Sequence, residues 1–251
     1  MRKIMPCLDI KDGKVVKGVN FENIKEMGEP IDLARKYEAA GADELAFLDI
    51  TKTNDGHGFY LDLISEITNA IQIPLNVGGG IASLEDIAAI LNAGASKVSI
   101  ASAALSKPDF IKQAVDQFGQ EKIIIAFDVA RDLVSNQYFI YTNGGKKKSE
   151  FEVFDTMKKF DQIGVSAYLI TGIASDGAKL GFDIPFFQLA GKQTKTPLIA
   201  SGGAGKIQDF IELFQKTSVE YGLAASIFHQ NLVDIRSLKE NLADNGIAVN
   251  L

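Results

Sequence analysis

Two stretches of the sequence share one pattern: PLNVGGGI at residues 74–81 and PLIASGGA at residues 197–204. Each begins as a short apolar run and ends in consecutive glycines, which is typical of a buried β-strand that runs into a tight turn. Glycine has no Cβ, so the main-chain N–H groups of such a turn can approach an anion closely. Both stretches therefore predict a parallel strand followed by a candidate phosphate-binding turn.

Apolar runs of this kind recur along the whole chain. Amphipathic segments with helical spacing separate them, and this alternation indicates a parallel sheet covered by helices. Eight such units fit a single α/β domain, residues 1–251, folded as a (β/α)₈ barrel, which commonly takes about 200–250 residues. The predicted strands are Ile4–Asp9, Glu44–Asp49, Pro74–Val77, Lys97–Ile100, Ile123–Asp128, Ala167–Thr171, Pro197–Ser201 and Tyr221–Ala225.

Corresponding features recur in the two halves of the chain. Asp9 and Asp128 end the first and fifth predicted strands, the glycine runs follow the third and seventh, and small residues follow the fourth and eighth. This recurrence predicts a barrel with an internal twofold repeat, built from half-barrels at approximately residues 1–120 and 121–251.

Two connections, residues 10–29 and 129–152, are much longer than the others. Connections between strand and helix in such folds usually take about 2–6 residues, and longer ones often carry function. We therefore expect these two segments to form a lid and a small hairpin over the site.

The composition is that of an ordinary globular protein, with 46% hydrophobic residues and a net charge of −6 at pH 7. This balance argues against nucleic acid as a partner, because phosphate backbones are bound mainly by clustered Lys and Arg. The run Lys146-Lys147-Lys148 is predicted to be a solvated turn. The single cysteine, Cys7, and the lack of an apolar stretch of about 18 residues predict a cytoplasmic protein without disulfides or membrane segments.

The turns after the third, fourth, seventh and eighth predicted strands supply candidate phosphate-binding residues. Small-residue turns can begin helices, whose N-termini favour anions as bare glycine turns do. Two such sites at one mouth of a barrel imply a substrate phosphorylated at both ends. The alternative is that the glycines only allow tight turns between strand and helix. The candidates are Gly79, Gly80 and Ser102 on one side, and Gly202, Gly203, Ala225 and Ser226 on the other.

Asp9 and Asp128 are the candidate catalytic pair, because both strands end at the mouth where barrel enzymes carry out their chemistry. Two carboxyl groups with different pKa values can divide the work of general acid and general base. Alternatively, each Asp caps a turn. Lys17, in the long first connection, is a candidate to close over the substrate, or else a solvated lysine.

Three further residues have less specific patterns. Asp49 ends the second predicted strand, and two roles are considered for it: a direct contact with the substrate, or a hydrogen bond that supports other residues of the site. His57 and His229 have no partners at metal-ligand spacing, so we predict neither a metal nor a cofactor.

Six motifs together identify a family resemblance that covers the whole chain. This set is highly specific and resembles the cyclase subunit of imidazole glycerol phosphate synthase, of histidine biosynthesis. The motifs are PCLDIKDG at 6–13, VVKGVNF at 15–21, FLDIT at 47–51, VGGGI at 77–81, ASGGAG at 200–205 and LAASIFH at 223–229.

The resemblance implies a lyase reaction. Ammonia attacks a bis-phosphorylated ribulosyl aminoimidazole carboxamide ribonucleotide, which cyclises and splits into imidazole glycerol phosphate and aminoimidazole carboxamide ribonucleotide. Asp9 and Asp128 match the family's acid/base pair, Lys17 matches the lysine of its mobile first loop, and Asp176 and Gly177 match residues of its substrate site.

The resemblance also implies a partner. The family's ammonia comes from a glutaminase subunit, which forms a heterodimer by docking on the N-terminal face of the barrel, and it passes along the barrel axis. Lys3, Glu44 and Lys97 match charged residues at the entrance of that channel.

The chain departs from the family pattern at three places. Ala101 stands where Asn is usual, Ala167 stands where a channel Glu is usual, and residues 172–178 read GIASDGA instead of a more polar run. The side-chain donors lost at Ala101 and in residues 172–178 affect substrate contact. The ring of charge, incomplete at Ala167, affects the entry of ammonia.

Three other functions compete with this one. The sister isomerase of the same pathway has the same construction and works without ammonia, but the lysine-bearing loop at 15–21 favours the cyclase. A cyclase paralogue that aminates a surface sugar would fit the departures. A non-catalytic phosphometabolite-binding subunit would activate its glutaminase without turnover.

Overall fold

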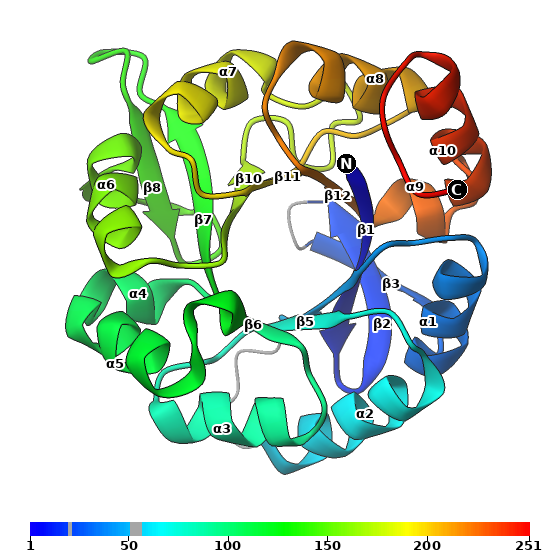
Figure 1. The fold of residues 1–251 in the computed structure, drawn as a ribbon, viewed down its shortest axis with the longest axis horizontal. Helices are drawn as coiled ribbons and strands as arrows, with labels where there is room; N and C mark the ends of the chain where they lie inside the picture. The colour runs from blue at the N-terminus through cyan, green and yellow to red at the C-terminus, as the bar shows by residue number, and fades with distance from the viewer. Residues whose placement is uncertain (20–21, 51–56) are drawn as a thin grey trace.

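The computed structural model describes residues 1–19, 22–50 and 57–251. Within them, eight strands pair in parallel and close into a barrel, because β12 pairs with β1 as well as with β11 (Figure 1). This confirms the predicted (β/α)₈ fold. The barrel strands are β1 (Lys3–Lys11), β4 (Leu45–Asp49), β5 (Leu75–Gly78), β6 (Lys97–Ile100), β7 (Ile123–Arg131), β10 (Ala167–Gly172), β11 (Leu198–Ser201) and β12 (Tyr221–Ala224).

Helices surround the barrel as a ring (Figure 1). They begin where the sequence offers helix-starting signals, such as Pro30 in the first turn of α1 and the Ser83 cap of α3, which accepts a hydrogen bond from the Asp86 main-chain N–H. The helices are α1 (Pro30–Ala39), α2 (His57–Ala70), α3 (Leu84–Asn92), α4 (Ser102–Ser106), α5 (Pro108–Phe118), α6 (Val153–Ile163), α7 (Ile184–Gln193), α8 (Ile207–Lys216), α9 (Ser226–His229) and α10 (Ile235–Asp244), with a 3₁₀ turn η1 (Gln120–Lys122). None of the described helices is long and apolar enough to cross a membrane.

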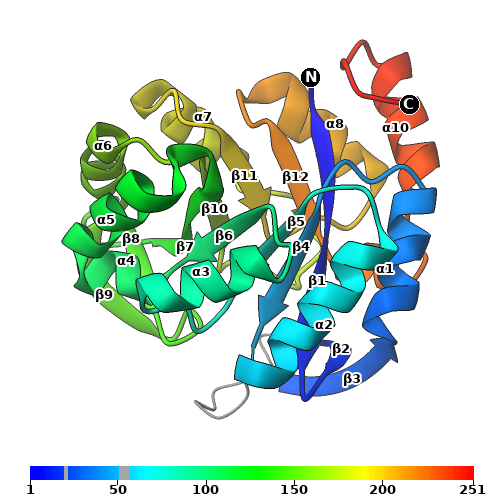
Figure 2. The same cartoon turned by 60° about the horizontal axis from the view of Figure 1, so that its bottom comes forward.

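Both long connections form antiparallel strand pairs. After β1 come β2 (Lys14–Val19) and β3 (Glu22–Gly28), and after β7 come β8 (Tyr138–Thr142) and β9 (Lys147–Glu152). β1 and β7 extend beyond Asp9 and Asp128 because they pair with β2 and β8. Figure 2 shows β2 and β3 below the barrel, at the end away from the N-terminus. The twofold repeat itself stays a prediction.

The buried residues form two layers that follow the alternation of a β-strand. Along β1, Ile4 and Leu8 pack outward against the helices, whereas Met5 and Cys7 point into the barrel. Strands covered on both faces are apolar throughout, as in other parallel sheets. The interior cluster consists of Met5, Cys7, Ala46, Ile124, Ala167, Leu169, Ile199, Tyr221 and Leu223.

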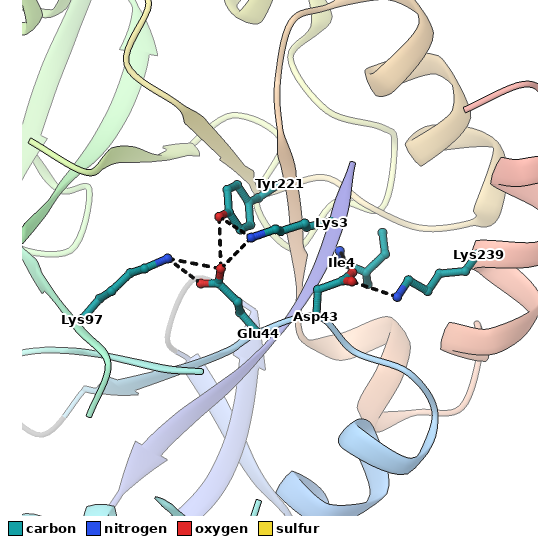
Figure 3. A network of polar contacts seen from close by, with 7 residues as sticks. All are labelled: Lys3, Ile4, Asp43, Glu44, Lys97, Tyr221 and Lys239. Atoms are coloured by element: carbon teal, nitrogen blue, oxygen red, sulfur yellow. Dashed lines mark hydrogen bonds and ion pairs between the residues drawn. The ribbon is translucent and has the colours of Figure 1, made fainter. Parts of the chain in front are cut away.

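A buried ion pair joins α10 to the N-terminal end of the barrel (Figure 3). The Lys239 ammonium donates to Asp43 Oδ1 at 3.0 Å and to the Gly41 carbonyl at 2.6 Å, and Asp43 Oδ2 accepts from the Ile4 main-chain N–H at 2.8 Å. Both side chains are about 5% exposed or less. Removing one partner would therefore leave the other charge buried and uncompensated.

We predict that Lys239→Met lowers the free energy of unfolding by about 3–5 kcal/mol, because Asp43 would keep a buried charge. Urea denaturation measures this change. Lys216→Met is the control, since Lys216 pairs with Glu212 on the exposed surface of α8 and should change stability by less than about 1 kcal/mol. Equal effects of the two substitutions would contradict the importance of the buried pair.

Candidate active site

Two adjoining cavities, of about 400 and 230 Å³, open at the carboxyl ends of the barrel strands. The larger is lined by the turns after β11 and β12, including the predicted residues Gly202, Gly203, Ala225 and Ser226, and also by Asp176 and Gly177. The smaller is lined by Gly79 and Ser102, whereas Gly80 is in the lining of neither. Residues common to both linings are Leu48, Ile50, Asp128, Gly144 and Thr171.

The glycines of both turns are required by close backbone packing. At Gly79, with φ of +106°, an added Cβ would lie 2.3 Å from the Asp49 carbonyl oxygen. At Gly203, with φ of +104°, it would lie 2.0 Å from the Gly181 carbonyl oxygen. The glycines are therefore needed for tight turns. The same turns expose main-chain groups at the cavities, so the tight-turn and phosphate-binding interpretations are compatible.

Asp9 reaches the larger cavity because it follows Met5 and Cys7 on the inward face of β1. It is 8% exposed, and the Cys7 thiol donates a hydrogen bond to Asp9 Oδ1 across 3.3 Å. Asp9 and Asp128 thus line one cavity, as the sequence predicted for a catalytic pair.

The two cavities meet at Asp128. Its burial raises the pKa of the carboxyl group to about 6, and the nearby negative charge of Asp176 adds to the shift. Asp128 therefore keeps a proton at mildly acidic pH, where an ordinary Asp is ionised. A carboxyl group in this state can act as a general acid.

The positions of the other candidates differ. Asp49 lines the smaller cavity, next to Gly79. Lys17 lies in β2, and its side chain is outside the described part of the structure, as is that of His57. Among the described residues, no group of three or more His, Cys, Asp or Glu side chains could hold a metal ion.

Comparison with known proteins decides the family. The sequence profile of the family described as "Histidine biosynthesis protein" matches residues 3–234. The chain belongs to this family. Its resemblance to the cyclase subunit is also confirmed: proteins named "Imidazole glycerol phosphate synthase subunit HisF" from Staphylococcus aureus strains RF122 / ET3-1 and MRSA252 are each 47% identical over 248 residues, which cover 99% of this chain and 98% of each relative.

This member of the histidine biosynthesis family has a charged cluster at the opposite end of its barrel (Figure 3). Glu44, which is 2% exposed, accepts hydrogen bonds from Lys3 at 3.1 Å and from Lys97 at 2.9 and 3.1 Å. The residues matched to a channel entrance therefore do lie together. Ala167 begins β10, which pairs with β7 and β11 and not with the strands of this cluster, and it is buried.

Tyr221 completes this cluster, and sequence reasoning did not single it out. Its hydroxyl donates to Glu44 Oε1 at 3.0 Å and accepts from the Lys3 ammonium at 2.9 Å. Burial alone would lower the pKa of Lys3, but the hydrogen bond to Tyr221 and the negative charge and hydrogen bond of Glu44 raise that pKa above its ordinary value. The position of Tyr221 at the start of β12 was a signal, since Lys3 and Lys97 also begin barrel strands.

The β8–β9 hairpin agrees with the hairpin expected in residues 129–152, but sequence reasoning did not single out the residues of its turn as site residues. Gly144, Gly145 and Lys146 line the larger cavity, and Lys146 is exposed in this turn, so the expected solvated turn is present and also borders the site. Only the antiparallel pairing of β8 with β7 brings this turn over the mouth of the barrel. The length of the 129–152 connection indicated a hairpin, but no spacing in the sequence indicated which of its residues would border the cavity.

We predict that Asp176→Asn lowers the pKa of Asp128 from about 6 while leaving it above the ordinary value of 3.8, because burial, the larger cause, remains. Titration of the Asp128 carboxyl carbon by NMR measures the shift. Asp155→Asn, on the exposed surface of α6, is the control and should leave the midpoint unchanged. An unmoved midpoint in Asp176→Asn would show that the two carboxylates do not interact.

Proposed function

We propose that the chain is the cyclase subunit of imidazole glycerol phosphate synthase. It would convert the bis-phosphorylated ribulosyl aminoimidazole carboxamide ribonucleotide and ammonia into imidazole glycerol phosphate and aminoimidazole carboxamide ribonucleotide. The observation that carries this proposal is the pair of adjoining cavities, each lined by a glycine turn, with Asp128 at their junction. The name of relatives at 47% identity supports the same reaction.

The proposed substrate lies across both cavities. One phosphate would be held at Gly202, Gly203 and Ser226, and the other at Gly79 and Ser102. Main-chain N–H groups at bare turns are suited to phosphate oxygens, which accept several hydrogen bonds. Holding both ends leaves the middle of the substrate beside Asp128, and such positioning removes much of the entropic cost of the reaction.

Asp128 acts as the general acid in this proposal, and Asp9 as the general base. The raised pKa of Asp128 supports its role, since a proton donor must still be protonated when the substrate is bound. The thiol of Cys7 donates a hydrogen bond to Asp9 Oδ1, which helps to hold that carboxyl group at the cavity, where a base is needed.

Ammonia would come from a glutaminase subunit docked at the N-terminal end of the barrel, near Lys3, Glu44 and Lys97. The apolar interior between the two ends supports transit of a small neutral molecule and disfavours charged ones. The family's entrance includes a Glu where this chain has Ala167, and the Tyr221 hydroxyl supplies Glu44 and Lys3 with a hydrogen-bonding partner instead.

The direct test is incubation of the purified chain with the bis-phosphorylated substrate and an ammonium salt, with products identified by mass. Ammonia-dependent formation of both products supports the proposal. An Amadori isomerisation without ammonia would instead indicate the sister isomerase, and tight binding without turnover would indicate a non-catalytic subunit. Turnover of an amino-sugar precursor alone would indicate the surface-sugar paralogue.

We predict that Asp9→Asn and Asp128→Asn each lower kcat by at least about a hundredfold, the usual contribution of a general acid or base, while substrate binding changes little. Steady-state kinetics with saturating ammonium and titration calorimetry measure the two effects. Asp116→Asn, on the exposed surface of α5, is the control. Unchanged kcat in both active-site variants would defeat the acid/base assignment.

We also predict that Ser102→Asp and Ser226→Asp raise KM by about tenfold or more, because a carboxylate would repel the phosphate bound at either turn. Ser106→Asp is the matched control: it lies in the same short helix as Ser102, and the described linings of the cavities do not include it. An equal rise in KM for all three substitutions would show that the effect comes from the added net charge. The proposed phosphate positions would then be wrong.

A further inference from the structure

The three consecutive lysines after β8 lie in three different environments. The Lys148 ammonium forms an ion pair with Asp132 and lies 4.0 Å from the centre of the Phe139 ring. Lys147 is exposed, and its main chain pairs with that of Thr142 in the hairpin. Lys146 alone of the three lines the larger cavity. All three lysines are therefore exposed, and among them Lys146 also borders the larger cavity.

The turn that carries Lys146 is anchored over the cavities. The Lys146 main-chain N–H donates to the Thr142 carbonyl at 3.1 Å, and an added Cβ on Gly145 would lie 3.4 Å from Ile173, in the segment after β10. Gly144, two residues before Lys146, lines both cavities. Lys146 thus lies in a turn that is closed by a main-chain hydrogen bond and comes close to the segment after β10.

The charges of the residues that line the two cavities indicate why Lys146 matters for phosphate binding. Four carboxylates line the cavities, those of Asp9, Asp49, Asp128 and Asp176. Among the described residues in these linings, Lys146 is the only basic one. A phosphate group carries a charge of about −1.5 to −2 at neutral pH, so it would be repelled by such a site unless a cation lay close to it.

We propose that Lys146 binds the substrate phosphate held at the turn after β11, as the cation that offsets the acidic lining of the larger cavity. This phosphate is assigned because Lys146 shares its cavity with Gly202, Gly203 and Ser226 and is not in the lining of the smaller cavity. A lysine ammonium group carries a compact charge and three hydrogen-bond donors on a flexible side chain, which suits contact with a phosphate group in the cavity. The inference rests on the proposed bis-phosphorylated substrate.

The test compares Lys146→Ala with Lys147→Ala, which removes the same charge from the next residue of the hairpin, outside the cavity lining. Lys146→Ala is expected to raise KM by about tenfold to a hundredfold with little change in kcat, because a binding contact present before and during the reaction is lost. Lys147→Ala should keep KM within about twofold of the unsubstituted chain, as expected for an exposed charge that does not line the cavity. Lys146→Arg should restore part of the affinity.

A binding measurement with inorganic phosphate separates this inference from the proposed reaction. Titration calorimetry should give weaker phosphate binding for Lys146→Ala than for the unsubstituted chain and Lys147→Ala. That result supports the role of Lys146 even if the chain does not turn over the proposed substrate. A lack of turnover would defeat only the proposed function. Equal phosphate affinity in all three proteins, absence of phosphate binding in all of them, or equal KM values in the two variants would overturn the assignment.

Discussion

The pairing of β12 with β1 is the contact on which the rest of the structure depends. It closes the sheet, so that each barrel strand has a parallel neighbour on both sides and no barrel edge is left open. Because all eight strands run in the same direction, their carboxyl ends meet at one mouth. Residues as distant in sequence as Asp9 and Ser226 thereby line a single cavity.

The closed barrel also separates two kinds of chemistry along its axis. Lys3, Glu44, Lys97 and Tyr221 form a hydrogen-bonded cluster at the amino ends of the strands, while carboxylates and bare turns gather at the carboxyl ends. Apolar side chains fill much of the interior between them. Such an interior admits small neutral molecules more readily than ions, because burying an unpaired charge is costly. The proposed passage of ammonia from one end to the other depends on this separation.

Much of the fold and part of the site could be predicted from local pattern. The strands at residues 4–9 and 123–128 were recognised because continuous apolar runs are a local property, and the carboxylates at their ends were placed at one mouth by the geometry of parallel barrels. The ends of these strands were predicted too early, because β1 and β7 continue as partners of antiparallel strands. That pairing is a long-range contact which periodicity does not report.

The amino-acid order was enough to establish the barrel, its glycine turns and the inward direction of Asp9, since each depends on spacing within one strand and the turn after it. The cavity position of Lys146 and the contact of Tyr221 with Glu44 and Lys3 were decided only by the folded chain. Hairpin pairing and barrel closure bring these groups together across long separations in sequence. Their partners are therefore set by tertiary packing, which no local pattern contains.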